Sequence, residues 1–314
     1  MDRCLYCYGE LAKGQVDFHG ECSKKMFGTA TPPELPYTRD SAAELVKYVV
    51  QKHTSILGTQ PKLPLRLDLK GKETPKCFSV AEPSDDYILK LQTEKCRQLP
   101  ELEDLTMHLA EIAKIKTVPH SLIRLADGEF CYITKRIDRD TRKNALPIED
   151  MCQLSGRLAE NKYKGSYEQV ARLILKYSAA PKLDLANFWE QVMFCWLTGN
   201  ADLHLKNISL YSRAEGMYTL TPAYGMYSTA LVMDDKDDLA LTLNRKRSKL
   251  RRVDFEIAFS QSGLNKKVGD NIFAKFERAI PDWLRFIEIS FLDDEMKGWY
   301  KTLINNMASL LFCR

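Results

Sequence analysis

The sequence predicts an α+β fold of two lobes, and three observations lead to this prediction. Short apolar stretches that alternate like strands occupy the chain up to about residue 140. Beyond that point, apolar residues recur mainly at helical spacing. The 314 residues are enough for two domains of about 150 residues each. We therefore expect a segment with clustered Cys and His residues at 1–30, a strand-rich N-lobe at 31–140 and a helical C-lobe at 141–314.

The N-lobe is expected to begin with a linker at 31–40 that contains three prolines. Two amphipathic helices are predicted over 41–53 and 100–114, because their apolar residues recur every three or four positions. Alternation of apolar and polar residues predicts strands at 65–69, 77–80, 87–91 and 129–137.

The C-lobe is expected to be mostly helical. A polar loop at 198–207 and two strands, at 208–211 and 217–221, interrupt the helices. The segments that favour helix are 148–158, 168–176, 183–197, 271–279 and 283–311.

The composition indicates a globular protein of mild charge. With 45% apolar residues, 28% charged residues and a net charge of +4, the chain is neither disordered nor collagen-like. Its apolar stretches are far shorter than the ~20 residues that cross a bilayer, and its first residues lack the apolar core of a signal peptide.

Nine cysteines, most of them scattered along the chain, suit reduced thiols. We expect a cytoplasmic protein that contacts neither membrane nor nucleic acid directly, with the basic run 245–252 forming a solvated turn and helix start.

A cluster of metal-ligand residues lies near the N-terminus. Cys4, Cys7, His19 and Cys22 follow the pattern C-x2-C-x11-H-x2-C, which supplies two close pairs of soft or borderline ligands. Such pairs suit a tetrahedral structural zinc ion. The alternative is a hairpin with free thiols and no ion. A closed site with four protein ligands has no open position for catalysis, so we expect a structural role.

The most informative segment for chemistry is the polar loop Gly199-Asn-Ala-Asp-Leu-His-Leu-Lys-Asn207. A carboxylate followed five residues later by an amide is the spacing at which protein kinases place a catalytic base beside a metal-holding Asn. In that arrangement the carboxylate orients the attacking hydroxyl, the amide oxygen holds Mg²⁺, and a nearby Lys neutralises the transferring phosphoryl group. The alternative is a polar loop with no chemistry.

Two further residues fit the same hypothesis. Lys90 lies on a predicted strand, as a cation that binds nucleotide phosphates would, and Glu103 lies on the following helix, where it could pair with the Lys90 ammonium. Each residue alone is usually just exposed, and their order along the chain is what favours a function.

Several motifs of the chain resemble those of HipA-type serine/threonine kinases, the toxin kinases of bacterial toxin–antitoxin pairs. Ser55-Ile-Leu-Gly-Thr-Gln-Pro-Lys62 is similar to the S/T-x-x-G-x-Q-x-K loop of that family, and Asn200–Asn207 matches its N-x-D-x-H-x-K-N loop at every fixed position. The regions around Lys90, Glu103, 135–139 and 149–153 resemble further landmarks in the same order. The resemblance covers roughly residues 50–230.

The resemblance implies a two-lobed protein-kinase-like fold that binds ATP and Mg²⁺ in the cleft between the lobes. Lys90 would hold nucleotide phosphates and pair with Glu103, and Ser55 would be an autophosphorylation site that can disable the kinase. The other residues implied to contact the nucleotide are Gly58, Thr59, Gln60 and Lys62 in the phosphate loop, and Lys135 and Ile137 beside the adenine.

The same resemblance implies catalytic roles. Asp202 would be the catalytic base and Asn207 a Mg²⁺ ligand, with Asn200, His204 and Lys206 in the same catalytic loop. The implied substrate is a protein hydroxyl, in this family often on an aminoacyl-tRNA synthetase. The chain resembles the short HipT-like branch, which lacks the N-terminal subdomain. The implied partners are a HipB-like DNA-binding antitoxin and a separate small HipS-like protein that supplies the missing subdomain.

One position departs from the family pattern. The second Mg²⁺-binding carboxylate is expected in a P-x-Y-D sequence, the counterpart of the kinase D-F-G aspartate, but this chain reads Pro222-Ala-Tyr-Gly225. Loss of that ligand is expected to lower phosphotransfer roughly a hundredfold or more, because metal-assisted charge stabilisation contributes several kcal/mol. Gly225 either is natural, in a pseudokinase, or is an inactivating change in a toxic kinase.

Three functions therefore remain open at this point. The first is a protein kinase that Gly225 impairs, and the second is a nucleotide-binding pseudokinase that acts by holding an antitoxin. The third is a zinc-knuckle nucleic-acid binder, which the absence of a dense basic surface disfavours.

Overall fold

The computed structural model describes residues 2–52, 60–68, 76–80, 86–140, 144–234 and 237–312. The chain forms two compact units, Met1–Asp104 with Val118–Lys143 and Leu105–Thr117 with Asn144–Arg314. Within the described residues, no helix combines the length and the apolar character that crossing a membrane requires.

The first unit contains a five-stranded antiparallel sheet with the strand order β2-β1-β3-β5-β4. Four of the strands lie where alternation predicts them. The fifth, β4, is missed because its residues are buried in a continuous run and its first two, His120 and Ser121, are polar. The strands are β1 Lys62–Asp68, β2 Cys77–Val80, β3 Tyr87–Lys90, β4 His120–Arg124 and β5 Phe130–Lys135.

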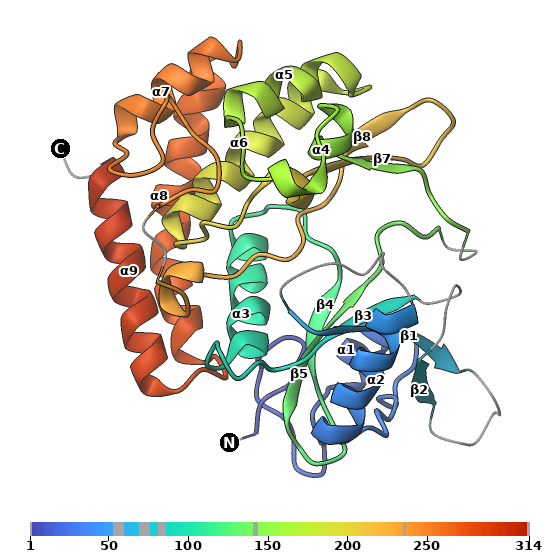
Figure 1. Cartoon of the computed structure of the whole chain (residues 1–314). Coiled ribbons are helices and arrows are strands. Elements are labelled where there is room, and N and C mark those ends of the chain that lie inside the picture. Colours follow the sequence, from blue (N-terminus) through green and yellow to red (C-terminus); the bar gives the residue numbers. More distant parts are fainter. Residues whose placement is uncertain are drawn as a thin grey trace. The chain divides into compact units, whose positions relative to one another are not determined.

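The helices of the first unit are α1 Gly20–Phe27, α2 Arg39–Lys52 and the start of α3 Leu99–Ile112. α2 packs along β1, and α1 lies nearby at the sheet (Figure 1). α1 brings Phe27 into edge-to-face contact with Phe18 and Phe78, with ring centroids 5.4 and 5.8 Å apart. Because aromatic rings bury a large apolar area, this contact fixes the N-terminal segment on the sheet.

The second unit is mainly helical. Its helices are the rest of α3, α4 Met151–Leu154, α5 Tyr167–Tyr177, α6 Pro181–Leu197, α7 Arg252–Gln261, α8 Lys266–Glu288 and α9 Asp294–Phe312. α6 runs through the core, with every residue from Gln191 to Leu197 buried, and α8 and α9 lie side by side (Figure 1). A small antiparallel sheet joins β6 Ile148–Asp150, β7 Ser209–Ser212 and β8 Tyr218–Leu220.

Three expectations for this unit are wrong in detail. The single helix predicted at 283–311 is divided between the end of α8 and α9, which begins at Asp294. The predicted helix 148–158 is a strand, β6, followed by the short α4, because Asp150 forms a capping box with Gln153 and starts the helix at Met151. α8 continues through Pro281 instead of breaking there. A proline inside a helix costs about 3 kcal/mol, and burial of Ile280, Trp283 and Ile287 on the same helix offsets this cost.

Candidate active site

The polar loop 198–207 follows α6, and the left-handed backbone of Gly199 determines the direction of the chain after the helix. Gly199 has a φ of +67°, a conformation that residues with a Cβ rarely adopt. A Cβ at this position would lie 2.6 Å from Leu303 Cδ2 and 3.0 Å from Ala230 Cβ. The sequence therefore needs glycine here to start the loop.

Replacing Gly199 by alanine is expected to lower the free energy of unfolding of the second unit by at least about 2 kcal/mol, from backbone strain and steric overlap. Gly298→Ala is the matched control, because Gly298 lies in α9 with open space around its Cα and gains helix propensity. Urea denaturation followed by tryptophan fluorescence suits this test, since the four tryptophans are Trp189, Trp196, Trp283 and Trp299 in the second unit. Equal midpoints for the two variants would contradict the steric argument.

One hydrogen bond holds the Asp202 carboxylate, which also lies beside an imidazole of the same unit. The Tyr163 hydroxyl donates to Asp202 Oδ1 over 2.5 Å, and His204 Nε2 lies 3.7 Å from the same oxygen. The Asn200 side chain accepts a hydrogen bond from the backbone N–H of Asp202 at 2.8 Å, and this bond stabilises the turn between the two residues. The Asp202 side chain is 26% exposed, so its carboxylate is both oriented and accessible.

The imidazole of His204 is fixed in one tautomer. Its Nδ1 accepts from the backbone N–H of Lys206 at 3.3 Å, so Nε2 carries the proton and faces Asp202. Burial is the main cause that lowers the pKa of His204, and Asp202 opposes the shift. Because its pKa is lowered from an ordinary value that is already below 7, His204 is neutral at pH 7, and its Nε2–H dipole faces the carboxylate.

Asn207 and Lys206 have defined orientations in the same loop. Asn207 Nδ2 donates to the backbone carbonyl of Asp202 at 2.7 Å, which leaves Asn207 Oδ1 as the side-chain atom suited to a hard cation. Lys206 Nζ donates to Asp150 Oδ2 at 2.6 Å. The other oxygen of Asp150 accepts from the backbone N–H of Gln153 at 2.9 Å, so Asp150 both caps α4 and holds the lysine.

Hydrogen bonds connect the segment containing Gly225 to the polar loop 198–207. The Tyr224 hydroxyl lies 2.8 Å from Ser209 Oγ and 3.4 Å from the Lys206 carbonyl. Loss of hydration raises the pKa of Tyr224 to about 12, so the phenol stays protonated. Thr229 Oγ1 accepts from the backbone N–H of Ala201 at 2.9 Å. Gly225 has a φ of +65°, in the left-handed region that Asp and Asn tolerate better than other side chains do.

In the first unit, Lys90 and Glu103 form an ion pair. Lys90 Nζ lies 2.5 Å from Glu103 Oε1, and the side chains are 16% and 0% exposed. Lys90 Nζ also lies 5.3 Å from the centre of the Tyr132 ring. Since Glu103 Oε2 is buried without a hydrogen-bond partner among the described residues, Lys90 is the cation that compensates this buried carboxylate.

The remaining residues predicted to contact nucleotide lie in different places. Lys62 pairs with Lys90 across β1 and β3, and Gln60 Nε2 donates to the Leu91 carbonyl at 3.3 Å, so Gln60 and Lys62 lie at the Lys90 end of the sheet. Lys135 pairs with Tyr87 at the other end of β3, and Ile137 follows β5 by two residues. Ser55, Gly58 and Thr59 lie outside the described residues.

Cys4, Cys7, His19 and Cys22 also come together, in the first unit, with their ligand atoms within 4.8 Å of one another.

Sequence reasoning missed two residues of the site, Tyr163 and Asp150. Tyr163 lies in a turn 39 positions before Asp202, and its ring meets His204 edge-to-face with centroids 4.9 Å apart. No local spacing connects residues that far apart. Asp150 lies within the 149–153 segment that resembles a family landmark. Its place before a short helix could have indicated a helix cap, but nothing in the sequence indicated its ion pair with Lys206.

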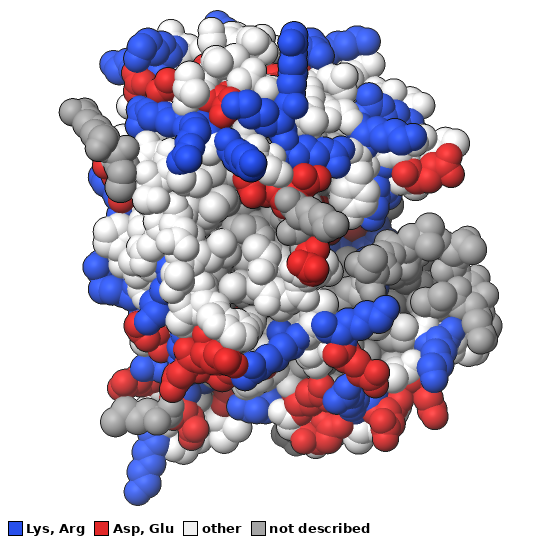
Figure 2. All heavy atoms as spheres, turned by 60° about the vertical axis from the view of Figure 1, so that its left-hand side comes forward, with Lys and Arg blue, Asp and Glu red and all other residues white. Residues whose placement is uncertain are grey.

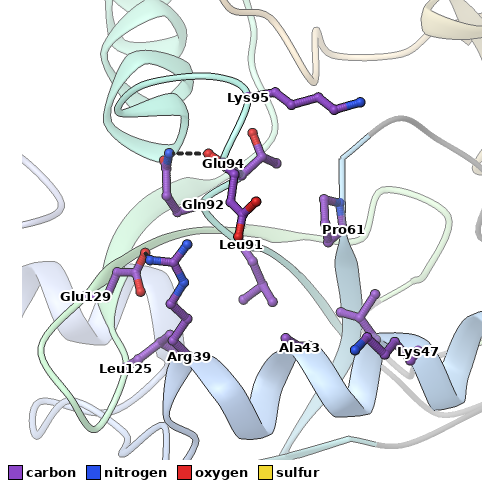
Figure 3. A pocket seen from close by; sticks show the side chains of 12 residues that line it. Arg39, Ala43, Lys47, Pro61, Leu91, Gln92, Glu94, Lys95, Leu125 and Glu129 are labelled. Atoms are coloured by element: carbon purple, nitrogen blue, oxygen red, sulfur yellow. Dashed lines mark hydrogen bonds and ion pairs between the residues drawn. The ribbon is translucent and has the colours of Figure 1, made fainter.

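A pocket of about 450 Å³ lies within the first unit, between α2, residues 91–95 and the turn that joins β4 to β5 (Figure 3). Arg39 and Glu129 reach toward each other at its wall, with Arg39 Nη1 3.6 Å from Glu129 Oε1. Pro61 and Leu91 also line it. The pocket therefore adjoins the strand that carries Lys90.

The basic run 245–252 forms turns up to the start of α7 at Arg252. Its charges have acidic neighbours: Lys246 Nζ lies 2.8 Å from Asp254 Oδ1, and Arg252 Nε lies 2.9 Å from Glu256 Oε1. The face in Figure 2 likewise carries acidic side chains among the basic ones. Such local pairing differs from the unbroken basic stripe of a nucleic-acid site.

Comparison with known proteins gives one family. A family model described as the HipA-like C-terminal domain matches residues 54–284. A Haemophilus influenzae protein that bears a kinase name is 29% identical over 212 residues, which cover 63% of this chain and 59% of that protein. The serine/threonine-protein kinase toxin HipA of Shewanella oneidensis is 27% identical over 229 residues, which cover 67% of this chain and 51% of the toxin. The chain thus spans little more than half the length of these relatives.

A solved structure shares the fold. The complex of Shewanella oneidensis HipA with HipB and operator DNA contains a chain that matches with a TM-score of 0.69. The match covers 95% of this chain and 79% of that chain at 21% identity. This likeness confirms the predicted α+β, protein-kinase-like fold.

Proposed function

The chain belongs to the family of HipA-like C-terminal domains, and we propose that it is an ATP-dependent protein serine/threonine kinase with Asp202 as its catalytic base. The observation that carries this proposal is the geometry of the catalytic loop. Asp202 Oδ1 is held by Tyr163 at 2.5 Å, while Asn207, five residues later, is turned by its bond to the Asp202 carbonyl at 2.7 Å. This is the arrangement by which kinases orient a hydroxyl beside a metal ligand.

As the substrate hydroxyl oxygen attacks the terminal phosphoryl group of ATP, the bond from that group to ADP breaks, ADP leaves, and the hydroxyl proton moves to the Asp202 carboxylate. Since Asp202 Oδ1 already accepts from Tyr163, Oδ2 is the oxygen that receives the proton. Lys206, steadied by Asp150, supplies positive charge near the loop. When bound, Mg²⁺ supplies charge neutralisation at the phosphates. Asn207 Oδ1 fits such a cation, and Gly225 offers it no side-chain oxygen.

Lys90 would contact the nucleotide phosphates, with Glu103 as its positioning residue. Glu103→Gln is expected to raise the KM for ATP roughly tenfold to a hundredfold, because a hydrogen bond to a charged group contributes about 1.5–3 kcal/mol. The exposed Glu44 of α2 provides the control, Glu44→Gln. Initial rates over a range of ATP concentrations separate KM from kcat. An unchanged KM for ATP in Glu103→Gln would contradict a role of the Lys90–Glu103 ion pair in nucleotide binding.

The proposed substrate is a protein hydroxyl, on an aminoacyl-tRNA synthetase or another protein, together with Ser55 of the chain itself. A HipB-like antitoxin is proposed as a partner, supported by the HipB named in the complex of the HipA relative. A small HipS-like protein is proposed as a second partner on the resemblance to the short branch alone. The first test is ATP–Mg²⁺ binding by calorimetry, with ATP alone as the comparison. Binding that strengthens with Mg²⁺ supports the kinase proposal, and no binding of either form contradicts it.

A second candidate function rests on Gly225. If glycine is the natural residue, the chain would bind nucleotide through Lys90 and Asn207 and act as a pseudokinase that holds an antitoxin. Phosphotransfer separates the two candidates, because a pseudokinase binds ATP without turning it over.

A further inference from the structure

The N-terminal segment contains a cluster of metal-ligand atoms that the proposed kinase activity does not use. Cys7 Sγ lies 3.4 Å from His19 Nδ1, and Cys22 Sγ lies 3.8 Å from the same nitrogen. Cys4 Sγ completes the group, and all four ligand atoms lie within 4.8 Å of one another. In a tetrahedral zinc site with Zn–S of about 2.3 Å and Zn–N of about 2.0 Å, neighbouring ligand atoms are about 3.5–3.8 Å apart. The cluster therefore approaches the dimensions of a zinc site.

The hydrogen bonds around His19 select the nitrogen that a metal needs. His19 Nε2 lies 3.0 Å from the carbonyl oxygen of Glu10, which can only accept, so Nε2 carries the proton. The lone pair is thus on Nδ1, the nitrogen that faces the cysteine sulfurs. A backbone carbonyl that fixes the tautomer in this way is the usual outer partner of a metal-bound histidine.

The backbone is also shaped around the sulfurs. The backbone N–H of His19 donates to Cys4 Sγ at 3.4 Å, a bond that favours a thiolate. At Gly9, a Cβ would lie 3.4 Å from both Cys7 Sγ and His19 Cε1. The backbone at Gly9 thus comes so close to two of the ligands that a Cβ there would be in van der Waals contact with both.

We propose that Cys4, Cys7, His19 and Cys22 bind one Zn²⁺ ion in a closed tetrahedral site of structural function. Each cysteine binds as a thiolate, so binding releases the thiol protons to solvent. All four ligands come from the chain, and no position is open for water or substrate.

The proposed ion would hold a segment that contacts α3 and the outer strand of the sheet. The Leu5 carbonyl accepts from Ser121 Oγ at 3.0 Å, and the Tyr8 hydroxyl donates to Asp104 Oδ2 at 2.9 Å. His120 Nδ1 lies 2.7 Å from Asp104 Oδ1. Asp104 directly follows Glu103, the partner of Lys90. Through the hydrogen bond from Tyr8 to Asp104, the zinc-bound segment thus stabilises the turn of α3 that carries Glu103.

The full chain, purified without added chelator, tests the proposal by metal analysis and cobalt substitution. We expect one zinc per chain, and after exchange with Co²⁺ we expect the intense d–d absorption of a tetrahedral site with thiolate ligands. Absence of zinc, together with no cobalt spectrum after reduction of the thiols, would overturn the proposal.

Two variants assign the ion to this cluster. Cys22→Ser is expected to abolish stoichiometric zinc binding, whereas Cys77→Ser, which changes a half-buried thiol of the same unit, is expected to retain it. Zinc retained in Cys22→Ser at the level of Cys77→Ser would place the ion elsewhere and overturn the assignment.

A measurement on the unaltered chain covers the case in which Cys22→Ser fails to fold. Alkylation of the native protein, followed by mass spectrometry, is expected to label Cys7 and Cys22 only after a zinc chelator is added. Equal labelling of both thiols before and after chelation would contradict metal binding. This readout needs no phosphotransfer, so its outcome is independent of the kinase proposal.

Discussion

Asp202→Asn is expected to lower phosphotransfer from γ-labelled ATP by about 10²–10⁴-fold, the range that a general base contributes. The amide has nearly the shape of the carboxylate and can still accept from Tyr163 through its oxygen, but it cannot take a proton. The measurement is the rate of label transfer to Ser55 or to a partner protein, in a Gly225→Asp background if the parent chain is too slow to follow.

Two companion variants separate proton transfer from positioning. Tyr163→Phe keeps the carboxylate and removes one hydrogen bond, so a smaller loss of about tenfold is expected. Asp234→Asn, at an exposed position, is the control for the loss of a charge. A rate for Asp202→Asn equal to that of the Asp234→Asn control would exclude Asp202 as the base.

Gly225→Asp is expected to raise phosphotransfer roughly a hundredfold or more, because it supplies the second carboxylate for Mg²⁺. The backbone at Gly225 is already left-handed, with a φ of +65°, and aspartate tolerates this region. Aspartate can therefore adopt the backbone conformation of this segment, which Tyr224 links to the Lys206 carbonyl, with less strain than most other side chains. The assay is label transfer at saturating ATP, over a range of Mg²⁺ concentrations.

Gly225→Asn is the matched control, since asparagine shares the shape and the backbone preference of aspartate and lacks its charge. A rise in Gly225→Asp that Gly225→Asn does not share would assign the effect to the carboxylate. If Gly225→Asp binds ATP and stays as inactive as the Asp202→Asn blank, the kinase proposal fails, and the pseudokinase proposal is favoured.

Spacing along the chain was enough to find the local parts of the site. Asp202 and Asn207 are five residues apart in one loop, so sequence alone could place them together. Tyr163 and Asp150 belong to the same site, 39 and 56 positions from their partners, and only the tertiary structure reveals these contacts. The sequence signals a local geometry, whereas long-range pairing depends on how the helices and strands pack.

The fold shows the same division. Strands with one buried face, such as β3 with Tyr87 and Leu89 inside, follow the alternation that predicts them. β4 does not follow this alternation, because His120 and Ser121 are polar. Their burial is compensated by hydrogen bonds to Asp104 and to the Leu5 carbonyl. In α8, tertiary packing of Trp283 overrides the local preference of Pro281.

The left-handed backbone at Gly225 also has a consequence for how such a chain evolves. Some glycine codons differ from an aspartate codon by a single base, and the main chain at this position already has a conformation that aspartate accepts. Where the gene uses one of these glycine codons, a single base change adds or removes the carboxylate. A population carrying such a gene can then pass between the two forms by one point mutation in either direction.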